Sequence, residues 1–156
     1  MAVLRATMLV HAPVELVFDV ARDIGEHNAA LAHTGERAVP PGRTRGLLEC
    51  GDLVCFRARH FGLRWRLDAR IVALDRPRSF VDVQVSGPFR RLRHQHFFAA
   101  TTGGTLVTDA IEWTSPLWPL GLAADTLVVR RRLLAILAAR SAHLKRRAEL
   151  AATRTR

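Results

Sequence analysis

The strongest constraint on the fold is an alternation of apolar and polar residues through the middle of the chain. Between residues 63 and 72 the apolar positions are Leu63, Trp65, Leu67, Ala69 and Ile71, and the polar positions between them are Arg64, Arg66, Asp68 and Arg70. Because successive side chains of a strand point to opposite faces, this period of two predicts an antiparallel strand with one buried face. The same period extends from Leu47 to Trp113.

Turn signals divide this region into strands of about seven to eleven residues. They are Phe61-Gly62, Asp75 to Arg78, Gly87-Pro88 and Thr102 to Gly104. Since short turns join antiparallel neighbours, we expect a meander of strands.

Helical periodicity flanks the strands on both sides. After Pro13, apolar residues at i, i+3, i+4 and i+7 predict a helix over Val14–Ala21, and a second short helix is expected over Gly25–His33. From about Leu120 to Leu150 the pattern predicts a long terminal helix that lies on the sheet. The stripe on its inward side is Leu122, Val129, Leu133, Ile136, Leu137, Arg140 and Leu144.

The length of the chain, 156 residues, is that of one domain, which buries roughly 70% of the surface exposed by the unfolded chain. Residues 1–150 are therefore expected to form a single α+β domain, with 151–156 as a frayed C-terminal tail. The apolar run from Leu133 to Ala139 is far shorter than the ~20 residues of a membrane-spanning helix. The N-terminus lacks a secretory signal pattern, so we expect a cytoplasmic protein.

The net charge of +10 comes almost wholly from arginine, since Lys145 is the only lysine. A basic balance indicates an anionic partner only where the charges gather on one face. Exposed aromatic residues do not accompany the arginines, so we expect no specific nucleic-acid partner. Cys50 and Cys55 lack the spacing of a redox or zinc motif and are interpreted as reduced thiols.

One hairpin predicts where polar groups meet the core. If a tight turn pairs Thr101 with Gly104, the register follows by counting along both strands. The pairs on the apolar, inward face are then Phe98 with Val107, His96 with Asp109, His94 with Ile111 and Leu92 with Trp113, while Arg93 with Glu112 and Gln95 with Ala110 face outward. This register places two histidines and a carboxylate among core residues.

Three interpretations of His94, His96 and Asp109 remain open, because an unpaired buried polar atom costs ~1 to 3 kcal/mol. They form a structural cross-strand pair of His96 with Asp109, or the polar end of an apolar pocket, or a three-ligand metal site. Histidine pairs on strands are more often packed than metal-bound. We therefore expect neither a metal nor another cofactor.

The strand from Phe80 to Ser86 brings two further polar candidates. If Leu74 pairs with Ser79, Asp82 faces Ile71 and Gln84 faces Ala69, both inward. A simple loop through Gly87-Pro88-Phe89 would demand the opposite phase, so we expect a bulge near that loop.

Arginines oppose one another on the outer face of the predicted sheet. A tight turn after His60 places Arg59 opposite Arg64 and Arg57 opposite Arg66. Like charges directly opposed destabilise a sheet, so either solvent screens them or an anion binds between them. We favour a solvated arginine face.

Several segments match a known pattern together: Gly62 to Trp65, Pro77 to Phe80, Phe80-x-Asp82-x-Gln84-x-x-Gly87-Pro88-Phe89, His94-x-His96-x-Phe98, and Gly103 to Thr105 with Asp109. Over nearly the whole chain the sequence resembles the START-like helix-grip superfamily (SRPBCC), which includes polyketide cyclases and dehydrases and lipid-transport proteins. The resemblance implies an α+β helix-grip fold. Its curved antiparallel sheet of about seven strands surrounds a long C-terminal helix, with two short helices after the first strand.

Members of this superfamily share a cavity rather than one chemistry, so three functions are considered. The first is a carrier or sensor that binds a small, largely apolar molecule, such as a lipid, an isoprenoid or a polyketide-like compound. The second is a cyclase- or dehydrase-like acid–base enzyme with His94, His96 and Asp109 as candidate catalytic residues. The third is a peripheral lipid-transfer protein whose arginines make weak contact with an anionic membrane.

Whether the protein is an enzyme is left open, and a monomer or a homodimer is expected. The predicted ligand-binding residues are Phe56, Trp65, Leu67, Asp82, Gln84, His94, His96, Phe98, Val107, Asp109, Ile111 and Trp113.

Overall fold

A computed structural model describes residues 1–60, 63–115 and 128–154. Its strands are β1 (Ala2–Val10), β2 (Arg37–Val39), β3 (Leu53–His60), β4 (Leu63–Asp75), β5 (Ser79–Ser86), β6 (Arg91–Thr101) and β7 (Gly104–Thr114). Its helices are α1 (Val14–Ala21), α2 (Ile24–Leu31), the short 3-10 helix η1 (Ala32–Thr34) and α4 (Arg130–Arg154).

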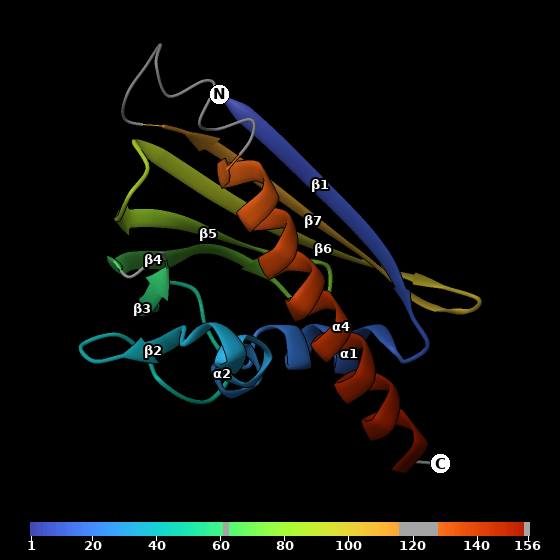
Figure 1. The fold of residues 1–156 in the computed structure, drawn as a ribbon. Helices are drawn as coiled ribbons and strands as arrows, with labels where there is room; N and C mark the ends of the chain where they lie inside the picture. Colours follow the sequence, from blue (N-terminus) through green and yellow to red (C-terminus); the bar gives the residue numbers. More distant parts are fainter. Residues whose placement is uncertain (61–62, 116–127, 155–156) are drawn as a thin grey trace.

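All seven strands form one antiparallel sheet in the order β1-β7-β6-β5-β4-β3-β2. The long helix α4 lies across one face of this curled sheet, and α1 and α2 lie together at one end (Figure 1). The expected α+β helix-grip architecture, with two short helices after the first strand, is confirmed. None of the helices among the described residues is long and apolar enough to span a membrane.

The helices differ slightly from the predicted ranges. Helix α1 occupies the predicted residues, and α2 starts earlier than predicted, because the side chain of Asp23 caps it by accepting a hydrogen bond from the Gly25 N–H at 2.7 Å. The helix α4 continues to Arg154 rather than ending at Leu150. Its predicted beginning near Leu120, and the predicted turn at Phe61-Gly62, lie outside the described residues.

The β6–β7 hairpin has the predicted register at every pair from Thr101 with Gly104 to Leu92 with Trp113. The opposition of Arg57 with Arg66 is also observed. The β6–β7 register follows from its tight connection, because a two-residue turn leaves the flanking strands one way to pair.

The β4–β5 register agrees with the prediction at Ile71 and Asp82 but differs at the turn. Leu74 pairs with Phe80 rather than with Ser79, but a register shift between Ile71 and Ala73 restores the predicted pair of Ile71 with Asp82. A second shift, in which Val85 is left unpaired, lies beside the loop where a bulge was expected, although it interrupts the pairing with β4 rather than with β6.

Two helices, α1 and α4, pack against the inner face of the sheet and form the core with it. Phe18 of α1 is fully buried and meets Phe98 edge-on, with ring centroids 5.1 Å apart. Leu137 of α4, 2% exposed, packs against a cluster that includes Trp113 and Ile111. Each such side chain contributes roughly 1.5 to 3 kcal/mol by burial, so the helices are held on the sheet mainly by apolar contacts.

The opposed arginines of the outer face are bridged from within the sheet. Asp68, which the alternation placed on a solvated face, is only 4% exposed. Its carboxylate accepts hydrogen bonds from Arg57, at 3.0 Å, and from Arg66. The prediction of a wholly solvated arginine face is therefore wrong for this pair, because a neighbouring carboxylate supplies the anion.

Candidate functional site

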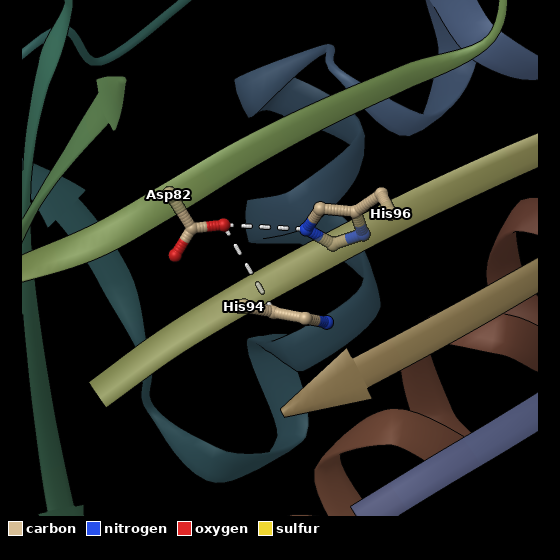
Figure 2. A group of neighbouring side chains, drawn as sticks. All are labelled: Asp82, His94 and His96. Carbon is tan, nitrogen blue, oxygen red and sulfur yellow. Dashed lines mark hydrogen bonds and ion pairs between the residues drawn. The ribbon is translucent and has the colours of Figure 1, made fainter. Parts of the chain in front are cut away.

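Four polar side chains from three adjacent strands meet on the inner face of the sheet. Asp82 of β5 pairs with His94 of β6, and His96 of β6 pairs with Asp109 of β7. His94 and His96 are two residues apart, so both face the interior, and Asp82 extends toward them from the neighbouring strand (Figure 2). We refer to Asp82, His94, His96 and Asp109 as the His–Asp cluster.

The two imidazole rings are held between the two carboxylates. On one side, Oδ1 of Asp109 accepts from Nδ1 of His96 at 2.6 Å and from Nε2 of His94 at 3.0 Å. On the other side, Oδ1 of Asp82 lies 3.2 Å from Nε2 of His96 and 4.0 Å from Nδ1 of His94. The ring centroids of the histidines are 3.8 Å apart. Each carboxylate thus faces one nitrogen of each ring.

Burial and mutual charge divide the protonation states within the cluster. Burial alone would lower the pKa of His96, but Asp109 and Asp82 outweigh it and raise that pKa above its ordinary value. Burial, followed by the charge of His96, lowers the pKa of His94 to about 4. Burial would raise the pKa of Asp109, yet the charge of His96 brings it well below its ordinary value. His94 is therefore neutral at pH 7.

Two residues outside the predicted set also face this cluster. Arg140 of α4 lines the same cavity. Its positive charge adds to the effect of the histidines that lower the pKa of Asp82, and it offsets only part of the rise in the pKa of His96. Within the described part of the chain its guanidinium makes no hydrogen bond or ion pair. His27 of α2 stacks on Phe56, with ring centroids 4.6 Å apart, and lies 3.2 Å from Glu36. The sequence feature that indicates an inward-facing Arg140 is its position in the apolar stripe of the last helix.

The cluster forms the polar end of a space between the sheet and the helices. An inner compartment of about 120 Å³ has both polar and apolar walls. Its polar lining residues are Asp23, His27, Glu36, Asp82, His94, His96 and Arg140, and its apolar ones include Phe56, Leu67 and Ile111. An adjoining outer compartment of about 180 Å³ shares Phe56 and Leu67 and is lined almost wholly by apolar atoms, among them those of Trp65, Phe89, Val128 and Leu133.

Most of the predicted ligand-binding residues line these compartments, but some lie elsewhere. Phe98, Val107 and Asp109 line a smaller space of about 30 Å³ beside α1. Trp113 is 1% exposed and packs in the core near Leu137 without lining either compartment. The amide of Gln84 donates to the Phe89 carbonyl at 2.6 Å, so Gln84 fixes a loop instead of facing the cluster.

A curled antiparallel sheet that grips a terminal helix around such a space defines a START-like, small-molecule-binding fold. A sequence profile described as polyketide cyclase / dehydrase and lipid transport matches residues 1–149. The chain belongs to this family. Among proteins with curated descriptions, no sequence matches the chain significantly.

Solved structures similar to this chain share its fold over nearly their full length. TTHA0849 from Thermus thermophilus superposes with a TM-score of 0.76 and 18% identity, covering 96% of this chain and 99% of that one. Major latex-like protein 151 from Panax ginseng gives a TM-score of 0.67 and 13% identity, covering 94% and 97%. Ms6760 from Mycobacterium smegmatis gives 0.67 and 16%, covering 92% and 88%. At these identities the similarity concerns the fold alone.

Proposed function

We propose that this protein binds a small, largely apolar molecule, such as a lipid, an isoprenoid or a polyketide-like compound, as a carrier or sensor. The observation that carries the proposal is that an inner compartment bordered by Asp82, His94 and His96 of the His–Asp cluster adjoins a second compartment with almost wholly apolar walls. Ligand pockets of this kind combine apolar walls with a few polar groups that fix orientation. The family to which the chain belongs supports the same function.

The His–Asp cluster and Arg140 together define what the polar end of the ligand must offer. Arg140 supplies only donors, so it pairs with a carbonyl, phenolate or carboxylate oxygen. Nδ1 of the neutral His94 is an acceptor, because its Nε2 donates to Asp109 at 3.0 Å. A ligand with both an acceptor oxygen and a hydroxyl therefore satisfies the site, while its apolar part extends past Leu67 toward Trp65.

The proposal is tested by filling the cavity with a larger side chain and measuring the binding of an apolar probe. Ile136 lines both compartments, so Ile136→Trp occupies the space in which the ligand would lie. Binding of the neutral fluorescent probe N-phenyl-1-naphthylamine is expected to fall at least tenfold in this variant. Leu134→Trp is the control, because Leu134 lies on the same helix and is 43% exposed. Equal probe binding by wild type and Ile136→Trp contradicts the proposal.

An acid–base enzyme of the cyclase or dehydrase type is the second candidate. It is favoured by the opposite shifts of the two histidines, since the pKa of His96 is raised and that of His94 is lowered. Groups perturbed apart in this way provide an acid and a base at one pH. His96→Gln distinguishes the candidates: an enzyme loses turnover of a poly-β-ketone substrate while keeping probe affinity, whereas a carrier shows no turnover in either form.

Contact with an anionic membrane is the third candidate, and exposed apolar residues at the outer compartment favour it. Trp65 is 37% exposed and Val128 is 54% exposed, and both line that compartment. Exposed arginines, including Arg130, follow in sequence. Co-sedimentation with phosphatidylserine vesicles that decreases steeply as salt rises supports this candidate, and binding indifferent to salt contradicts it.

A further inference from the structure

Three side chains of the His–Asp cluster direct potential metal ligands to one point. A carboxylate oxygen of Asp82 and one ring nitrogen each of His94 and His96 all lie within 4.8 Å of one another (Figure 2). They come from neighbouring strands of one sheet, so their backbones are fixed relative to one another by the β5–β6 pairing. The inner compartment borders all three.

A ring nitrogen of His94 faces a carboxylate oxygen of Asp82 inside the protein. Nε2 of His94 lies 3.0 Å from Oδ1 of Asp109, and the tautomer that donates this hydrogen bond leaves Nδ1 as an acceptor. That nitrogen faces Oδ1 of Asp82 at 4.0 Å, and the carboxylate is also an acceptor. A donor or a positive ion placed between two such acceptors would stabilise them both.

Asp109 has the position of an outer carboxylate that orients two metal-binding histidines. The same oxygen, Oδ1, contacts Nε2 of His94 at 3.0 Å and Nδ1 of His96 at 2.6 Å. These are the nitrogens that face away from Asp82. Histidines that bind metal usually donate their other ring N–H to a carboxylate or carbonyl, which fixes the tautomer.

We propose that Asp82, His94 and His96 bind one divalent transition-metal ion of the zinc or iron(II) type through Oδ1, Nδ1 and Nε2, respectively. Two histidines and one carboxylate are a known ligand set for such ions when further positions stay open. Ligands ~2.0 to 2.1 Å from a tetrahedral ion lie roughly 3.3 Å apart. The 3.2 Å between Asp82 and His96 fits this value, and the 4.0 Å between Asp82 and His94 must shorten.

This assignment differs from the three-ligand site considered from the sequence, in which Asp109 was the carboxylate ligand. It also differs from the expectation that no metal binds. The charges are compatible: with neutral histidines, Asp82 and Asp109 carry two negative charges and Arg140 one positive charge, and the carboxylates of Asp23 and Glu36 border the same inner compartment. A divalent ion therefore adds positive charge where negative charge predominates. The metal site does not depend on the proposed apolar ligand.

The test uses the full chain, stripped of metal with a chelator and titrated with Zn²⁺ alone. Nitrogen-detected NMR of the histidine rings is expected to show metal binding at Nδ1 of His94 and Nε2 of His96, at one ion per chain. Asp82→Asn removes the charged ligand and is expected to weaken Zn²⁺ binding at least 100-fold. Asp109→Asn is expected to weaken it by about 10- to 100-fold.

Glu26→Gln is the matched control, because Glu26 also accepts from a half-buried histidine, His143, at 2.7 Å but lies outside the proposed ligand set. It is expected to keep the wild-type affinity. Metal on the opposite ring nitrogens would make Asp109 the ligand and overturn the assignment. Absence of these NMR shifts in the wild type, or Zn²⁺ affinity unchanged in a folded Asp82→Asn, overturns the site altogether.

Discussion

Replacing Leu137 by alanine tests whether apolar contacts hold α4 on the sheet. Leu137 is 2% exposed and packs against Leu4, Leu92, Ile111 and Trp113. Leucine-to-alanine changes at such sites cost about 2 to 5 kcal/mol, from lost burial plus the remaining cavity. Because Leu137 borders the inner compartment, the new space joins an existing one that water can enter. We therefore expect a loss of about 3 kcal/mol.

Urea denaturation followed by circular dichroism measures this loss. In a separate thermal unfolding experiment, a loss of about 3 kcal/mol in a domain of this size corresponds to a decrease in Tm of roughly 6 to 12 °C. Leu134→Ala, at a position 43% exposed on the same helix, is the control and is expected to cost less than ~1 kcal/mol. If Leu137→Ala costs no more than Leu134→Ala, apolar packing of this helix does not stabilise the fold.

Three further predictions concern other parts of the chain. Gly104→Ala is expected to destabilise the protein by more than ~2 kcal/mol, because φ is +133° and the new Cβ would lie 2.2 Å from a carbonyl of β1; thermal unfolding measures this, and an unchanged Tm contradicts it. A thiol reagent is expected to modify exposed Cys50 quickly and Cys55 only on unfolding, since burial and then Asp68 raise the pKa of Cys55; equal rates refute this. A hydrogen bond from Arg66 lowers the pKa of Asp68, so its stabilisation is present above about pH 4 and lost as pH falls below the ordinary pKa; Asp68→Asn should flatten this acid dependence of urea midpoints.

Sequence reasoning succeeded where one local rule determined the arrangement. The inward positions of His94, His96 and Asp109 followed from a two-residue turn and the period of two, since each residue along a strand alternates faces. The first helix followed from its apolar stripe and the proline before it. These features depend on residues that are neighbours in the sequence.

Features that depend on three or more segments were not predictable in this way. The pairing of His96 with both Asp109 and Asp82 needs the relative position of three strands, and the β4–β5 shifts that set one of them leave little trace in the sequence. The alternation of its strand predicts that Asp68 faces solvent, yet its carboxylate is buried and paired with Arg57 and Arg66, which come from two strands. Arg140 was predicted to face inward, but its neighbours come from distant elements.

The pairing of β1 with β7 also has a consequence for the order in which the protein folds. Ala2 lies opposite Trp113 and Val10 opposite Thr105, so the first strand finds its partner about a hundred residues later. During synthesis β1 emerges first and must remain without its sheet partner until β7 has left the ribosome. Closing so large a loop carries an entropic cost before any contact rewards it. Folding is therefore expected to be limited by this last pairing, with an exposed strand at risk of association while it waits.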